Sequence, residues 1–120
     1  MAKIKLKQVD GISRKKASDA YESFMRHCKL KNLSLYSILY YEKNVTFFLA
    51  SLPGVKYMDE INQELIGDFI NMLMDKGNRV TAINARLRAA HVFLRYCFEQ
   101  EYLEPFPLSQ IKEDESFKEP

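Results

Sequence analysis

The chain has 120 residues, of which 47% are hydrophobic and 12% aromatic, and its formal net charge is +2. This length suits a single domain with a modest core, and the apolar and aromatic content argues against a wholly disordered chain. No segment approaches the roughly 18 consecutive apolar residues of a membrane span, and the segment Met1–Lys7 lacks the apolar centre of a signal peptide. We therefore expect a cytoplasmic protein that does not associate with membranes.

The N-terminal half of the domain is predicted to hold two helices behind a basic arm. Residues 1–12 include Lys3–Lys7, which alternates lysine with apolar residues and is expected to be a flexible arm. Ser13 is a suitable N-cap for a first helix that runs to about Lys29. Ser34 is predicted to begin a second helix, which ends near Leu52 because Pro53 and Gly54 follow it.

Two further helices are predicted in the C-terminal half. The third begins at Asn62 and ends before Gly77 and Asn78, a pair typical of a left-handed helix end. The fourth is expected to be capped by Thr81 and to fray near Glu101. Residues 112–120 are charged and resemble the start of a linker. The sequence thus predicts an all-α bundle of four helices over residues 13–111, with short connections and flexible termini.

The charge of the chain is unevenly distributed. Residues 1–50 carry ten Lys or Arg against four acids, giving +6, and residues 79–98 carry four Arg and no acid, giving +4. Residues 51–78 have a net charge of −3 and residues 99–120 a net charge of −5. Two basic segments in a nearly neutral chain favour a polyanionic partner, although an ordinary solvated surface would give the same totals.

The fourth helix separates an apolar stripe from a polar flank. At 100° per residue its apolar residues cluster on one side, and they are Ile83, Leu87, Ala90, Leu94, Cys97 and Phe98. The flank contains Thr81, Asn84, Arg88, His91 and Arg95. His91 alone is weak evidence for binding, because a single histidine at the edge of an apolar stripe is more often structural. Arginine binds phosphate or guanine with two hydrogen bonds, and asparagine can pair with adenine, so this flank suits nucleic acid. Arg86 points the other way and is expected to be structural, with an acid of the third helix as one candidate partner.

The outer face of the second helix combines aromatic and polar residues. Tyr36, Tyr40, Lys43 and Phe47 lie opposite its apolar stripe, with Ser37 and Asn44 beside them. Exposed aromatics next to lysine can pack on sugars or bases, or dock another protein. The alternative is that Tyr40 and Phe47 cover the first helix, and the pattern leaves both interpretations open.

Three helical segments, in order, and the turn that follows the last of them resemble the core-binding domain of tyrosine recombinases, the phage-integrase family. Ser34-Leu-Tyr-Ser37-xxx-Tyr41-xxx-Val45-xx-Phe48 is similar to the family's "S-x-x-T-x-x-x-Y-x-x-x-L-x-x-F". The stretch from Ile61 to Leu73 resembles that domain's third helix. The stretch from Asn84 to Tyr96 resembles "N-x-x-L-x-A-L-R-x-F-x-x-Y", and Tyr102–Phe106 resembles the family's exit turn. The resemblance covers about residues 16–111.

The resemblance implies a SAM-like four-helix domain that clamps double-stranded DNA through its second and fourth helices. Carried across position by position, the implied DNA contacts are Ser37, Tyr40, Lys43, Asn44, Thr81, Asn84, Arg88 and Arg95. The sequence departs from the family pattern at Ser37, Ala90, His91 and Glu104, which stand where Thr, Leu, Arg and Asn are usual.

The family's catalytic residues have no counterpart in these 120 residues. None of the seven tyrosines has a recognisable His/Arg constellation, so we expect no activity from this fragment, while the full-length parent would be a recombinase that integrates a mobile element. Sister protomers are the implied partners in the full complex, and the fragment alone is expected to be monomeric.

Two further expectations complete the sequence-based picture. Cys28 and Cys97 are predicted to be reduced thiols, and no cofactor or metal site is expected because neither has a second Cys or His at ligand spacing. The alternative to DNA binding, from a different class of function, is a helical protein–protein interaction module that uses Tyr36, Tyr40 and Phe47.

Overall fold

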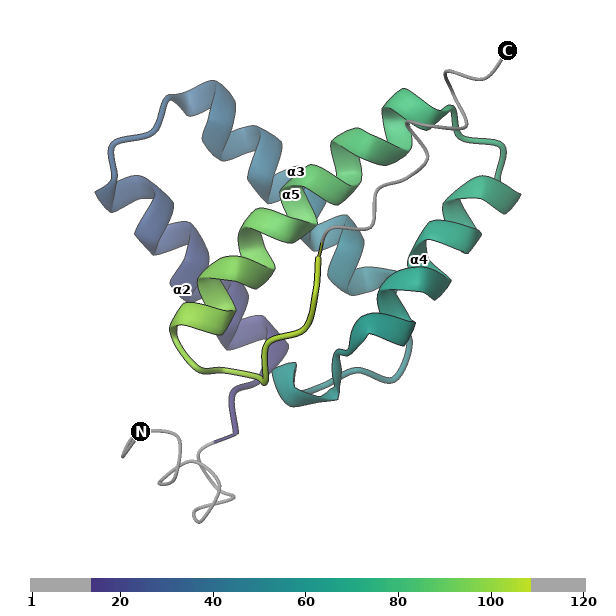
Figure 1. Ribbon diagram of the computed structural model, residues 1–120. Helices are drawn as coiled ribbons and strands as arrows, with labels where there is room; N and C mark the ends of the chain where they lie inside the picture. Colours follow the sequence, from purple (N-terminus) through teal and green to yellow (C-terminus); the bar gives the residue numbers. More distant parts are fainter. Residues whose placement is uncertain (1–13, 109–120) are drawn as a thin grey trace.

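The computed structural model describes residues 14–108, which form an all-α domain (Figure 1). In chain order the elements are α2 (Ala17–Leu30), α3 (Leu35–Ala50), the short 3₁₀ helix η2 (Met58–Glu60), α4 (Gln63–Asp75) and α5 (Val80–Glu99). The predicted all-α fold with four helices is confirmed for this range, in which the β-type pairing is an isolated bridge between Lys16 and Tyr57. The predicted arm (1–12) and linker (112–120) lie outside the described residues. The prediction that Ser13 caps the first helix is wrong, because α2 has its N-cap at Lys16.

The ends of the helices follow local capping chemistry. The Ser34 hydroxyl accepts a hydrogen bond of 3.1 Å from the Ser37 N–H, and Asn62 Oδ1 accepts one of 3.0 Å from the Leu65 N–H, so both predicted starts are confirmed. Gly77 ends α4 in the left-handed region, with φ +83°, as the sequence indicated. The prediction that Thr81 caps the last helix is wrong: the N-cap is Arg79, which offers no side-chain acceptor for a cap.

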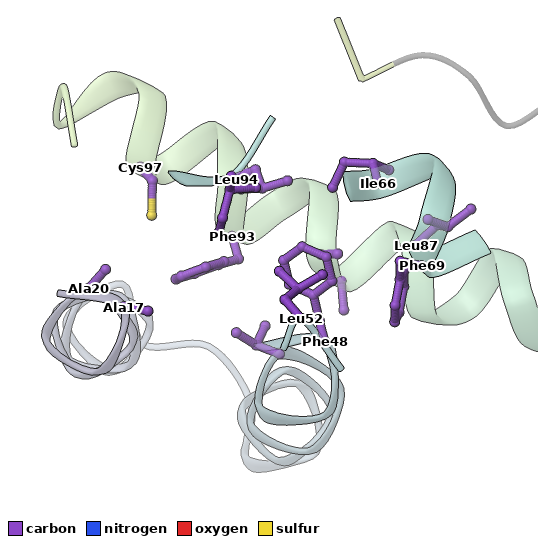
Figure 2. Packing of buried hydrophobic residues seen from close by; sticks show 14 of the residues in the cluster. Ala17, Ala20, Phe48, Leu52, Ile66, Phe69, Leu87, Phe93, Leu94 and Cys97 are labelled. Carbon is purple, nitrogen blue, oxygen red and sulfur yellow. The ribbon is translucent and has the colours of Figure 1, made fainter. Parts of the chain in front are cut away.

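Aromatic rings of α2 and α3 pack against rings of α5 and α4 in the core, and Figure 2 shows Phe48, Phe69 and Phe93 among the buried side chains. Phe24 of α2 packs edge-on against Phe93 of α5 with ring centroids 5.4 Å apart, and Phe48 of α3 packs against Phe69 of α4 at 5.0 Å. The predicted stripe of α5 is buried, with Phe98 at its edge only partly covered, but Phe93 is buried as well. The buried arc of α5 is therefore wider than one stripe, because this helix contacts each of α2, α3 and α4.

The helices are arranged around a crossing of α3 and α5. Figure 1 shows these two helices crossing near their middles, with α2 folded back on α3 and α4 on the other side of α5. After α5 the chain turns at Glu101, which has φ 64°, and Phe106 then packs against Phe98 with centroids 5.2 Å apart. No helix in residues 14–108 has the length and apolarity needed to cross a membrane.

Candidate nucleic-acid interface

Tyr40 joins the outer faces of α3 and α5. Its side chain is half-buried, and its hydroxyl donates a hydrogen bond of 2.6 Å to the main-chain carbonyl of Ala85. On α3, Tyr40 borders the exposed face that holds Tyr36 and Lys43, and on α5, Ala85 borders the exposed face that holds Arg88. The two faces therefore form one continuous surface at this contact.

Asn44 and Arg86 bind each other inside the crossing. Asn44 is only 8% exposed; its amide nitrogen donates to the Tyr40 carbonyl at 2.9 Å, and its oxygen accepts from Arg86 Nη1 at 3.1 Å. The Arg86 guanidinium also lies over the Phe47 ring, 3.7 Å from its centroid. Both polar groups of Asn44 are thus used within the protein, and we leave it out of the proposed interface. Arg86 is structural as expected, but its partners belong to α3 and are not an acid of α4.

The outer aromatics of α3 separate into two groups. Phe47 lies 6.1 Å from Phe69 of α4 and under Arg86 of α5, and Tyr40 bonds to α5, so both rings are engaged with neighbouring helices. Tyr36, by contrast, is 81% exposed. Of the three aromatics, only Tyr36 therefore remains available for an external partner.

Arg88 and Arg95 lie on the exposed face of α5. They are seven residues apart, so they project from the same side with about 10 Å of helix between them. Thr81 is also exposed in the first turn of α5, and Lys43 is exposed on α3. Every ion pair formed among residues 14–108 involves Arg14, whose partners are Asp59 and Glu60. The three cations Lys43, Arg88 and Arg95 therefore form no ion pair with a carboxylate of the described chain.

Ser37 and Asn84 are half-buried at the edges of this surface. The Ser37 hydroxyl accepts a hydrogen bond of 3.1 Å from the Ser34 hydroxyl, so it is engaged in the first turn of α3. Of the eight residues implied by the resemblance, four are exposed: Lys43, Thr81, Arg88 and Arg95. Ser37, Tyr40 and Asn84 are half-buried, and Asn44 is buried.

A depression of about 310 Å³ adjoins the surface between α2, α3 and α5. Its lining includes Phe24, Tyr41 and Tyr96, and the cations Lys31 and Arg95 also contribute. Burial raises the pKa of the Tyr41 phenol, and the positive charge of Arg88 partly offsets this rise. The sequence did not indicate Lys31 or Tyr41 as site residues, because no spacing within one helix links them to Arg95. Glu99, on the rim, is the acidic member of this lining.

His91 turns inward and not toward this surface. It is 6% exposed and lines a small apolar cavity with Ile66 and Ile70 of α4 and with Leu108. Burial, with a contribution from nearby Arg95, lowers the pKa of His91 to about 4. The imidazole is therefore neutral at physiological pH. Because His91 packs against α4, it is not part of the exposed polar flank of α5.

Comparisons of the chain with protein-family models, with curated proteins and with solved structures found no match. The function proposed below therefore stands on the residues and geometry of the chain itself.

Proposed function

We propose that this domain binds double-stranded DNA through the surface formed by α3 and α5. The observation that carries the proposal is the pair Arg88 and Arg95, two exposed guanidinium groups on one side of a 20-residue helix with no carboxylate partner in the described chain. A major groove about 12 Å wide admits an α-helix, and arginine binds both phosphate oxygens and guanine with paired hydrogen bonds.

Other residues of the surface fit the same ligand. Lys43 on α3 and Lys31 beside the depression add positive charge on the α3 side of the arginines. Since no side chain caps the start of α5, the main-chain N–H groups near Thr81 suit a phosphate at that end. Phosphate contacts of this kind position a protein on the duplex, and contacts to base edges then give sequence preference.

The resemblance to tyrosine recombinases supports a more specific role. In this proposal the domain is a core-binding clamp of a site-specific recombinase that acts in the cytoplasm and integrates a mobile element. Strand cleavage is the task of a catalytic domain outside these 120 residues, and sister protomers assemble through the complete protein. The described domain then binds DNA without cutting it.

Fluorescence anisotropy with a labelled duplex, over a series of salt concentrations, tests DNA binding. We expect binding that weakens steeply with salt, and Arg88→Gln and Arg95→Gln should each reduce the slope of log K against log salt by about 0.9. Lys56→Gln is the matched control, because Lys56 is exposed in the α3–η2 connection and its loss changes the net charge equally. If all three variants behave alike, or if the wild-type chain binds no duplex, the proposal is wrong.

A protein-interaction module remains the second candidate function, and one observation favours it. Tyr36 and its neighbour Leu35 are 81% and 71% exposed, which is unusual for large apolar side chains. Tyr40 and Phe47, the other aromatics of that hypothesis, are however engaged with α5 and α4. Exchange of Tyr36 for serine should leave DNA affinity within about twofold if the aromatic serves a protein partner.

A further inference from the structure

A second groove runs between α2 and α3 on the side away from α5. Its volume is about 390 Å³, and its apolar lining is formed by Tyr21 and Met25 of α2 and Ile38 of α3, all half-buried. Ile38 lies about 200° around α3 from Tyr40, which contacts α5. The lining of this groove therefore lies on the other side of α3 from the contact with α5.

Two exposed leucines extend the apolar floor of the groove. Leu35 and Leu39 are 71% and 52% exposed, and they lie beside Ile38 on α3, three residues before it and one residue after it. At 100° per residue they fall on the same side of Ile38 as Glu42, which also lines the groove. A contiguous stripe of Leu35, Ile38 and Leu39 facing solvent indicates an interaction surface.

The rim of the groove is electrically polarised along its length. Glu22 of α2 and Glu42 of α3 mark one end, where the Glu42 carboxylate is close enough to Tyr21 to add to the burial-driven rise of the Tyr21 pKa. Arg26 and Lys29 lie one and two helical turns further along α2, about 6 Å and 10 Å from Glu22 along the axis. One end of the groove is thus acidic and the other is basic.

We propose that two copies of this chain pair through the α2–α3 groove about a two-fold axis. In a two-fold interface the same patch faces itself, and a residue near one end meets a residue near the other end of its partner. The polarised rim would then place Arg26 and Lys29 of each copy against Glu22 and Glu42 of the other. The surface is self-complementary in charge, and the leucine stripes of both copies meet across the axis. A partner of different sequence would need basic residues opposite the acidic end of the groove and acidic residues opposite its basic end.

The free domain should pair only weakly. The groove and its two leucines fall well short of the roughly 20–30 residues on each side of a standard stable interface. Binding of two copies to neighbouring sites would raise their effective concentration and so favour pairing without any new contact. The pairing itself requires no DNA, so its test is independent of the function proposed above.

Sedimentation and amide chemical shifts of the full 120-residue chain, measured from micromolar to millimolar concentration, provide the test. We expect concentration-dependent association with shifts centred on Met25, Ile38 and Leu39. Lys29→Glu and Glu42→Lys should each weaken association about tenfold. Each substitution places two like charges opposite each other, and the two-fold axis repeats that repulsive contact at both ends of the pair. Both residues are exposed, so the fold should be unaffected.

A mixture of the Lys29→Glu and Glu42→Lys chains tests the proposed pairing most directly. In the mixed pair, the new carboxylate at position 29 of one copy meets the new ammonium group at position 42 of the other. The opposite end keeps the wild-type contact, so association should return toward the wild-type value. Lys56→Glu is the control, since it makes the same charge change as Lys29→Glu but lies outside the groove.

Any of four results would overturn the proposal. The first three are absence of association by the wild-type chain at millimolar concentration, absence of rescue on mixing, and equal weakening by Lys56→Glu. The fourth is association with shifts confined to Arg88 and Arg95, which would show that a different surface pairs.

Discussion

The Tyr40 hydroxyl and the Ala85 carbonyl oxygen lie 2.6 Å apart, and this hydrogen bond joins α3 to α5 at the border of their exposed faces. A carbonyl inside a helix has two lone pairs, so Ala85 can accept this bond in addition to one from its own helix. The contact holds Lys43 and Arg88 on one surface. The stability of the crossing and the geometry of the proposed interface are thus connected through one side chain.

Tyr40→Phe should lower the free energy of unfolding by about 1 kcal/mol, because it removes one half-buried hydrogen bond and keeps the ring. Urea denaturation followed by circular dichroism measures this value. Tyr36→Phe is the matched control and should change stability by less than about 0.5 kcal/mol, since Tyr36 is 81% exposed. Equal effects of the two variants would show that the Tyr40 bond does not stabilise the crossing.

Arg86→Met and Arg88→Met should have opposite consequences. Loss of Arg86 leaves the nearly buried Asn44 oxygen without its donor and removes the stacking on Phe47, so the free energy of unfolding should fall by about 1–3 kcal/mol. Loss of the exposed Arg88 should leave stability within about 0.5 kcal/mol. Under conditions where both variants are folded, only Arg88→Met should reduce the salt dependence of DNA binding. A reversed pattern would mean that the roles assigned to the two arginines are wrong.

His91 should make the domain less stable in mild acid. Its pKa is about 4 in the fold against about 6.5 in an unfolded chain, so the unfolded chain binds more protons between these values. The free energy of unfolding should therefore fall as the pH is lowered from about 6.5 toward 4, by up to about 3 kcal/mol. Above pH 6.5 this contribution is complete and constant.

Denaturation of the wild-type chain and of His91→Leu across this pH range isolates that effect. Leucine matches the apolar lining that Ile66, Ile70 and Leu108 provide, and it cannot take up a proton. The variant should lose most of the pH dependence between about 4 and 6.5. A residual fall in still more acidic solution is expected, because Arg14 lowers the pKa of Asp59, and protonation of that carboxylate also destabilises the folded state. An unchanged pH profile would show that His91 is solvated.

Substitutions at the N-caps of α4 and α5 should change the free energy of unfolding in opposite directions. Asn62→Ala should lower the free energy of unfolding by about 1 kcal/mol, because Asn62 Oδ1 accepts from the Leu65 N–H. Arg79→Ser should raise it by a similar amount, because Arg79 occupies the N-cap of α5 without a side-chain acceptor. Thermal melting of both variants measures the two shifts, and a loss of stability in Arg79→Ser would show that this arginine has a packing role.

Much of the fold followed from local signals in the sequence. Ser34, Asn62 and Gly77 fixed helix ends because capping and positive φ depend on residues close in the chain. The apolar stripe of α5 was also predicted, because a helix periodicity gives the direction of burial, although the buried arc is wider than that stripe. Thr81 was misassigned as a cap, since a hydroxyl residue near a helix start can lie in the first turn instead.

The site was harder to predict, because a helical wheel does not say which neighbour faces each side. Asn44 and Arg86 lie far apart in sequence, and their bond exists only because α3 and α5 cross. His91 borders the apolar stripe and is covered by Ile66 and Leu108, residues that no pattern within α5 could identify. Arg88 and Arg95 kept their predicted exposure because no other helix of the described range covers their side of α5.

The reactivity of the two cysteines reports local opening of the domain. Cys28 and Cys97 are free and buried, at 2% and 0% exposure, and burial raises the pKa of both thiols. A thiol reagent attacks the thiolate, so neither sulfur should react until the chain around it opens. The rate of alkylation therefore reports how often the contacts of α2 with α5 separate. A partner that binds only the closed form would slow alkylation, and the extent of the slowing would give the affinity of that partner. Neither molecule needs a separate label.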